Sequence, residues 1–158
     1  MNQSNHFSPS AHCHTSGAAL ETAARYASPT MIDILLEHGA ILENSRAINA
    51  AMFRETNNAD VIEMVEHLLK RGADINQLAL SMPGHHWGTR PLCIAAGLGN
   101  MELIHWLLDH GADPVAGDRM GLPPLGFAND WGQDEAEKFF DDLYDKLKSE
   151  GKLKDGDL

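Results

Sequence analysis

A chain of 158 residues with 43% hydrophobic residues is long enough for one domain with a continuous apolar core. Its formal net charge of −11, with no basic stripe, would repel a phosphate backbone and argues against direct nucleic-acid binding. No apolar run approaches the roughly 18 residues of a membrane helix, and the first residues lack the basic start and apolar stretch of a secretory signal. We therefore expect no membrane or nucleic-acid partner.

The chain begins and ends with polar segments. Residues 1–16 are predicted to be a flexible polar lead, and residues 151–158 a C-terminal tail. His12, Cys13 and His14 lie in the lead, which lacks the second ligand pair of a structural zinc site, so we expect no metal and no cofactor. Two cysteines in all give no disulfide framework. A reducing compartment is therefore expected. We expect the cytoplasm, and the nucleus is the alternative.

Between these segments, two kinds of short helical phrase alternate. The first kind combines alanines with apolar residues and recurs at Ala18–Tyr26, Ser45–Phe53, Arg90–Leu98 and Pro123–Trp131. The second is an amphipathic helix ended by Gly and followed by Ala, and it recurs at Met31–Asn44, Val65–Asn76 and Leu103–Pro114. The glycines suit the left-handed residue that ends a helix. Neither short helix can bury its apolar face alone, so neighbouring pairs are expected to stack.

A last helix is predicted at about residues 133–148. Its apolar residues are Phe139, Phe140, Leu143 and Leu147, and the rest is mostly charged. A repeat array needs one solvated end, so this helix is predicted to be a terminal cap.

The alternation resembles the ankyrin repeat, a unit of about 33 residues whose first helix opens with a T-P-L-H-x-A pattern. The best copy is Arg90–Pro114, with Pro91 in the first helical turn, Ala95 and Ala96 between the helices and Gly99 at the turn. The resemblance covers roughly residues 18–148.

This resemblance implies an all-α solenoid of about four helix–turn–helix repeats in a domain at residues 17–150. The repeats are predicted at about 17–44, 45–76, 88–117 and 121–150, the last one degenerate and capping.

Three irregularities interrupt the repeat. Six residues are inserted between the two helices of the second repeat, around Glu55–Asp60. The connection from Gly39 to Ser45 is six residues shorter than the last connection, which leaves no room for the usual projecting hairpin. The connection from Gly72 to Arg90 is six residues longer, so an enlarged finger is predicted at 77–89. Insertions in repeat proteins often map to the binding face.

In ankyrin-like proteins the inner groove is formed by the fingers and by the exposed end of each first helix. Carried over by position, the predicted partner-binding residues are Arg25, Tyr26, Met52, Phe53, His86, Trp87, Thr89, Leu98, Arg119, Met120, Asp130 and Trp131, with His14, Thr15 and Leu122 in matching places. Aromatic, Met and Arg residues are typical of interface hot spots. We therefore expect a non-catalytic protein-interaction module whose partner presents a basic or mixed apolar and basic surface.

Other interpretations remain open from the sequence. Phe53 and Trp131 fit equally a role in plugging gaps left by the irregular repeats. A deep pocket in the same groove would favour a small apolar ligand or an atypical enzyme that uses His85 or His86 with Asp130 and Arg25. No catalytic motif is present, which argues against an enzyme. In a third interpretation, the chain is a subunit that docks through the face near residues 1–17.

Overall fold

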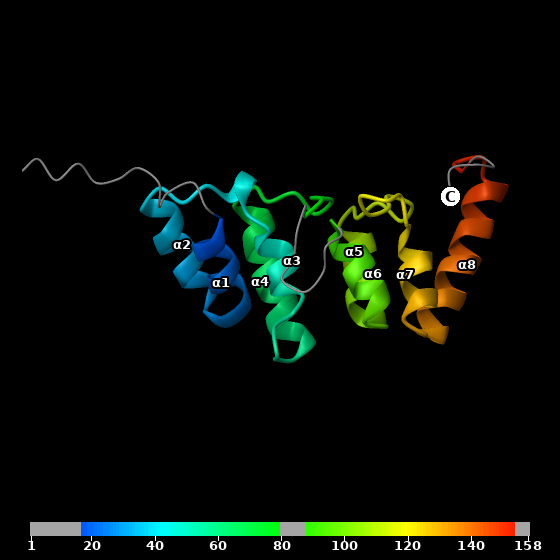
Figure 1. The fold of residues 1–158 in the computed structure, drawn as a ribbon, viewed down its shortest axis with the longest axis horizontal. Coiled ribbons are helices and arrows are strands. Elements are labelled where there is room, and N and C mark those ends of the chain that lie inside the picture. The colour runs from blue at the N-terminus through cyan, green and yellow to red at the C-terminus, as the bar shows by residue number, and fades with distance from the viewer. Residues whose placement is uncertain (1–16, 80–87, 154–158) are drawn as a thin grey trace, which may run out of the picture.

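The computed structural model describes residues 17–79 and 88–153, which form eight α-helices and one 3₁₀-helix (Figure 1). The first helices of the four pairs are α1 (Ala18–Tyr26), α3 (Ala47–Ala51), α5 (Pro91–Gly97) and α7 (Pro124–Asp130). The second helices are α2 (Pro29–Glu37), α4 (Asn58–Lys70), α6 (Met101–Asp109) and α8 (Asp134–Ser149). The predicted all-α solenoid of helix pairs is confirmed.

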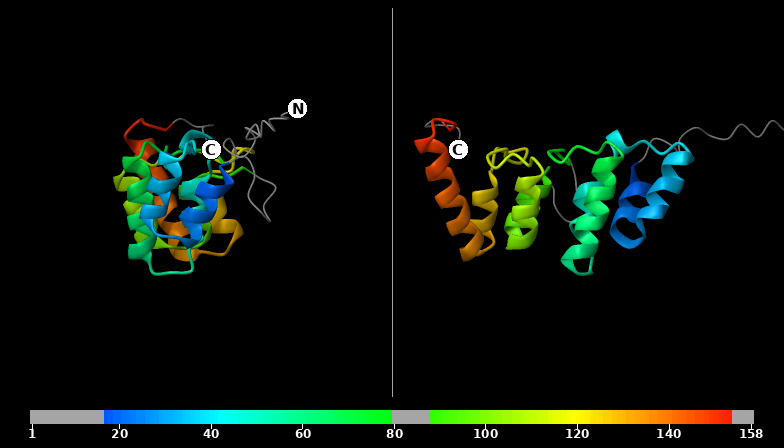
Figure 2. Two further views of the ribbon diagram at one scale, coloured as in Figure 1. Left: turned by 90° about the vertical axis from the view of Figure 1, so that its left-hand side faces the viewer. Right: turned by 180° about the vertical axis from the view of Figure 1, so that it is seen from behind.

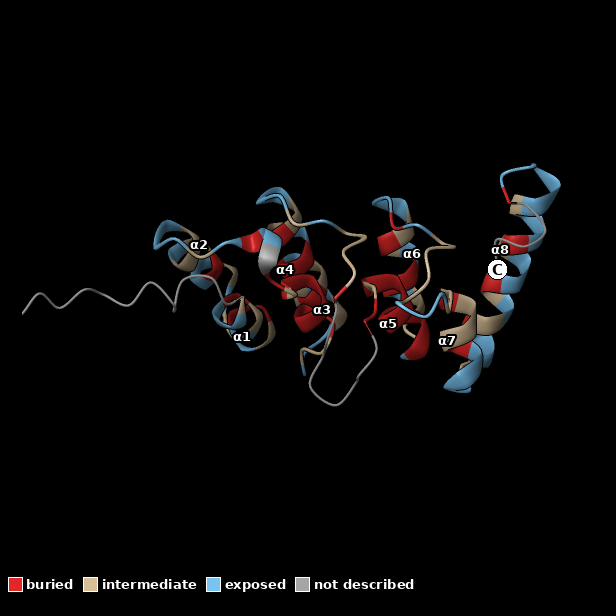
Figure 3. Ribbon diagram, turned by 45° about the horizontal axis from the view of Figure 1, so that its top comes forward, coloured by how far each residue is buried: buried red, intermediate tan, exposed pale blue. Residues whose placement is uncertain are grey.

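The pairs stack into two rows. First helices contact one another in the order α1, α3, α5 and α7, and α4 contacts both α2 and α6. Viewed from the α1 end, the two rows lie side by side (Figure 2, left). The core fills the space between them, and α3 and α5 are buried along their whole length (Figure 3). Fully buried side chains come from every pair, including Leu20, Ile48, Leu68, Leu107 and Phe140.

The three repeated helix ends have the geometry that the sequence predicts. Gly39, Gly72 and Gly111 adopt φ of 90°, 95° and 93°, a left-handed conformation that other residues rarely adopt. The imidazole Nδ1 atoms of His38 and His110 lie 2.7 Å from main-chain oxygens of the last helical turn, so both histidines cap their helices.

The six-residue insertion is divided between a turn and a helix. Six residues separate α3 from α4, whereas two separate α1 from α2, and α4 has thirteen residues where α2 and α6 have nine. Asn57 caps α4, because its side-chain oxygen accepts a hydrogen bond of 3.0 Å from the main-chain N–H of Asp60. In the same turn, the Arg54 guanidinium donates to the carbonyl oxygens of Ala24 (2.7 Å) and Ala27 (3.0 Å) at the end of α1.

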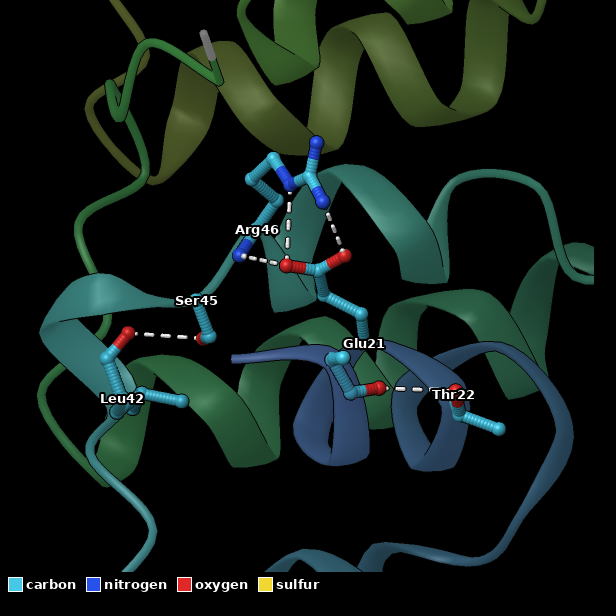
Figure 4. A network of polar contacts seen from close by, with 6 residues as sticks. Glu21, Thr22, Leu42, Ser45 and Arg46 are labelled. Atoms are coloured by element: carbon cyan, nitrogen blue, oxygen red, sulfur yellow. Dashed lines mark hydrogen bonds and ion pairs between the residues drawn. The ribbon is translucent and has the colours of Figure 1, made fainter. Parts of the chain in front are cut away.

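The connections between the pairs differ, as their lengths predict. The first is a single 3₁₀ turn, η1 (Leu42–Asn44), closed by a hydrogen bond of 2.8 Å from the Ser45 hydroxyl to the Leu42 oxygen (Figure 4). The second is held at its base by an antiparallel bridge between Ala79 and Thr89. The outer part of the predicted finger, residues 80–87, lies outside the described residues.

The two ends of the array have different surfaces. At the C-terminal end, α8 buries Phe140 and Tyr144 and carries its charges outward, so it serves as the predicted cap. Leu153 is also buried, which extends the packed region three residues into the predicted tail. At the other end, large apolar side chains are exposed on the pair α1–α2, at Tyr26, Met31 and Ile34, and on the connection after it, at Ile41. The predicted lead at 1–16 lies outside the described residues.

Candidate functional site

A cavity of about 780 Å³ opens on the inner groove between α5 and α7, and we call it the α5–α7 pocket. Three regions of the chain form its walls: the turn after α3, helix α5 with Thr89 before it, and the segment from the last connection through α7. Its lining residues are Phe53, Thr89, Cys93, Ile94, Gly97, Asp118, Met120, Gly121, Leu122, Pro123, Phe127, Asp130 and Trp131. Most of this lining is apolar, so the pocket can bury a large apolar group.

The absence of a side chain at Gly97 shapes one wall of the pocket. A Cβ atom built at Gly97 would lie 3.2 Å from Cδ2 of Trp131, closer than an ordinary carbon contact. The indole therefore lies directly over the end of α5, and any larger residue at 97 would displace it. Trp131 remains 46% exposed, so part of its surface faces the solvent at the mouth of the pocket.

The last connection forms the opposite wall through a tight turn. The carboxylate of Asp118 accepts hydrogen bonds of 2.8 Å from the main-chain N–H groups of both Met120 and Leu122. The N–H of Arg119 donates to the carbonyl oxygen of Gly88, which ties this turn to the base of the finger. Met120 is thereby held at the rim with 71% of its surface exposed.

Two side chains, Asn49 and Arg90, fix the base of the finger against the inner helices. Asn49 is fully buried, and its side-chain amide donates a hydrogen bond of 2.9 Å to the Thr89 carbonyl oxygen. The Arg90 guanidinium donates to the carbonyl oxygens of Gly117 (2.8 Å) and Asn76. These contacts join the second and third connections, so the pocket walls are held by bonds between repeats.

Charge around the pocket is of one sign. Among the described lining residues, the charged side chains are the carboxylates of Asp118 and Asp130, and none is basic. Asp130 is exposed at the end of α7, next to Trp131 in the chain. Cys93 lies in the floor, where burial raises the pKa of its thiol to about 12, so the group stays protonated and apolar.

The other half of the groove, between α1 and α3, is occupied by an arginine. The Cζ atom of Arg25 lies 5.1 Å from the ring centroid of Tyr26 and 5.9 Å from that of Phe53. Tyr26 is 69% exposed beside it. Near the opposite end of α1, Arg46 binds Glu21 through two parallel hydrogen bonds of 3.0 and 2.8 Å (Figure 4).

The structure brings together part of the predicted partner-binding set. The α5–α7 pocket is lined by six of the predicted residues, namely Phe53, Thr89, Met120, Leu122, Asp130 and Trp131. Arg25 and Tyr26 lie in the other half of the groove, Leu98 is exposed at the end of α5, and Arg119 is exposed on the last connection. His85, His86 and Trp87, together with His14 and Thr15, fall outside the described residues.

One expectation needs correction. Met52 is only 4% exposed and packs in the apolar core, because it continues the helical backbone at the C-cap of the buried helix α3. Two residues of the alternative enzyme site, Arg25 and Asp130, lie on α1 and α7, the first and last helices of the inner row (Figure 1).

Several residues that shape the site were not identified from the sequence. Gly97, Ile94 and Phe127 form much of the apolar wall, and Asp118 organises the turn. Gly97 and Ile94 lie inside the repeated phrase, where they look like ordinary core residues. An Asp followed three residues later by Gly, as at Asp118–Gly121, is a turn pattern that could have indicated the wall.

Two further findings bear on the range of functions. Within residues 17–79 and 88–153, no helix has the length and apolar character needed to cross a bilayer. Over the same ranges, His, Cys, Asp and Glu side chains form no group of three or more that could hold a metal ion.

Comparison with known proteins finds ankyrin repeats both in the matching family model and in a named relative. The family model described as "Ankyrin repeats (3 copies)" matches residues 48–145. An L-asparaginase of Dirofilaria immitis is 34% identical over 111 residues, 70% of this chain and 18% of that protein. The ankyrin repeat protein nuc-2 of Neurospora crassa is 30% identical over 115 residues, 72% of this chain and 10% of that protein.

A 2-5A-dependent ribonuclease of Mus musculus is 31% identical over 77 residues, 49% of this chain and 10% of that protein. The chain thus spans between 10% and 18% of the length of these three relatives. The similarity is confined to a small part of each relative, and the names of these whole proteins differ widely.

Proposed function

Because the chain belongs to the ankyrin-repeat family, whose repeats are generally protein-interaction modules, we propose that it binds a protein partner through the inner groove. The partner contacts the α5–α7 pocket and the finger at 77–89, whose base, Ala79 with Gly88 and Thr89, is described. No catalytic step is assigned to the chain.

The observation that carries this proposal is the partly open apolar pocket on the inner face. Monomeric proteins rarely leave large contiguous apolar surface exposed unless it is used for binding. Here Trp131 and Met120 remain 46% and 71% exposed beside buried Ile94 and the half-buried ring of Phe127. Large aromatic and Met side chains around a recess are typical of interface hot spots.

Rigidity of the walls also supports recognition without large rearrangement. Asn76 accepts a hydrogen bond of 2.8 Å from the Asp113 N–H and donates one of 3.0 Å to the Gly111 oxygen. Gln77 donates one of 3.0 Å to the Glu43 oxygen. Three consecutive connections are therefore joined, so the groove is preorganised and a partner loses less free energy in ordering it.

Site-specific photocrosslinking tests the proposal. A photoreactive amino acid is placed at Met120, on the pocket rim, or at Glu63, which is exposed on α4 in the outer row. The whole chain is then irradiated in extract from its source organism. We expect a discrete protein adduct from position 120 and not from position 63. Equal adducts from both positions, or none from position 120, would contradict the proposal.

A second candidate is binding of a small apolar molecule in the same pocket. The cavity volume of about 780 Å³ lies in the range of ligand pockets, roughly 300–1,000 Å³, and favours it. Native mass spectrometry of the purified chain, with and without the Trp131→Ala change, distinguishes the two. A bound small molecule that disappears in the variant, with no protein adduct at position 120, would favour this candidate over protein binding.

A further inference from the structure

We infer that the α5–α7 pocket recognises a peptide segment that places a large apolar side chain next to a lysine or arginine. This inference rests on the proposed function and specifies which chemistry the partner presents. The apolar side chain enters the recess, and the cation binds at its mouth beside Asp130 and Trp131.

The interior of the pocket selects for an apolar side chain. Phe53, Ile94 and Phe127 come from three different repeats and line one recess. Cys93 in the floor adds no charge, because burial raises the pKa of its thiol to about 12. A charged side chain that entered this recess would lose its hydration without a paired group in the floor. A Trp, Phe, Leu or Met side chain gains by burial instead.

The mouth of the pocket selects for a neighbouring cation. Asp130 is exposed on the last turn of α7, and the half-exposed indole of Trp131 follows it directly. A guanidinium or ammonium group can therefore approach a carboxylate and the face of an indole together. Asp118, on the opposite wall, adds a second negative charge, although its Oδ1 atom already accepts two main-chain hydrogen bonds.

The nearby cations do not cancel this preference. Arg25 lies on the α1 side of Phe53, 5.9 Å from its ring centroid, and Arg119 is exposed on the last connection. Neither belongs to the pocket lining, whose described charged residues are both acidic. The chain as a whole carries a net charge of −11, which adds attraction for a basic segment at longer range.

Selection from a random peptide display library on the whole chain tests the inference. We expect enriched peptides to share a large apolar residue with a lysine or arginine within three positions. Trp131→Ala should weaken their binding at least about tenfold, since it removes an aromatic anchor at the mouth. Asp130→Asn should weaken it about two- to fivefold at low salt, and this difference should shrink at high salt.

Matched controls separate the pocket from the rest of the surface. Tyr26→Ala removes an exposed aromatic from the other half of the groove, where Tyr26 is 69% exposed against 46% for Trp131, and Asp141→Asn removes an exposed carboxylate from α8. Both should leave peptide affinity unchanged. Circular dichroism of each variant checks that it is folded, and Met120→Ala, at a rim residue outside the core, gives a second pocket change with little risk to folding.

The outcomes distinguish this inference from the proposed function. Enriched peptides without basic residues, or peptides that bind the Trp131 and Met120 variants as tightly as the wild type, would overturn the inference. Protein crosslinking at position 120 would then still support protein binding. A library that yields no peptide above background also counts against the inference, and if crosslinking fails as well, the proposed function falls with it.

Discussion

The two halves of the inner groove are built from the same repeated phrase, yet they differ. The α5–α7 pocket opens in one of them, which we call the open half, and we call the half between α1 and α3 the closed half. Between α1 and α3, Arg25 lies against two aromatic rings and the short first connection forms a single 3₁₀ turn. Between α5 and α7, Gly97 leaves room for the Trp131 indole, and the longer connection supplies a wall. The difference shows that a glycine at the end of α5 and a longer connection accompany the pocket, in addition to the side chains that α5 and α7 contribute.

The largest expected effect concerns the support behind the open half. Phe140 is fully buried on α8, and Phe140→Ala should lower the free energy of unfolding by about 3–5 kcal/mol through loss of burial and an unfilled cavity. All three tryptophans lie at 87, 106 and 131, so their emission reports on the C-terminal half. The midpoint of urea unfolding should therefore fall to a lower urea concentration when it is followed by tryptophan emission and when it is followed by circular dichroism.

Leu20→Ala is the matched change in the other half, at a fully buried position on α1. This change should lower the free energy of unfolding by about 2–5 kcal/mol. Because each repeat contacts only its neighbours, the circular dichroism transition should shift more than the tryptophan transition. Equal shifts of both signals in the Leu20 variant would show that the two halves unfold as one unit.

The floor of the open half can be followed through Cys93. Its buried thiol, with a pKa raised to about 12, should react with iodoacetamide at pH 8 at least about a hundredfold more slowly in the folded protein than in denaturant. A Cys13→Ser background leaves Cys93 as the sole thiol. Rapid alkylation of the native protein would show that the pocket floor opens often.

The closed half should depend modestly on its ion pair. Arg46 and Glu21 form a two-point contact with both side chains largely buried, and a double-mutant cycle with Arg46→Met and Glu21→Gln should give a coupling of about 1 kcal/mol. The exposed pair Lys70–Glu66 on α4 is the control and should give about 0.3–0.5 kcal/mol. Equal couplings would mean that burial adds nothing to the first pair.

The smallest effect is an acid dependence in the outer row, on the helices α2 and α4 that pair with α1 and α3. Asp33 on α2 accepts a hydrogen bond from His67 and pairs with Arg71, both from the α4 end, and these contacts hold the pKa of the Asp33 carboxyl below its usual range. The lowered folded pKa favours the charged carboxylate, so the stabilisation is present above about pH 4 and is lost as pH falls through the folded value. Asp33→Asn should flatten the decline in melting temperature below pH 4, whereas Asp141→Asn should not.

The sequence was sufficient for the scaffold and for the location of the irregularities. Local features could be predicted because they depend on the types of neighbouring residues alone. They include the left-handed Gly39 and Gly111, the helix cap at Asn57 and the charged outer face of α8. The pocket could not be predicted from the sequence, because Gly97 and Ile94 occupy positions that are equally compatible with a filled core. The prediction that Met52 faces the groove was wrong, because a residue just after a short helix can point either to the groove or to the core.

We propose that recognition occurs in the open half of the groove. The most direct measurement is a map of amide and indole chemical-shift changes as an enriched peptide is titrated into the isotope-labelled whole chain. We predict that the largest changes fall on Ile94, Phe127 and the Trp131 indole, with little change at Arg25 or Tyr26. Changes centred on Arg25 and Tyr26, or on the outer row of helices, would contradict the claim.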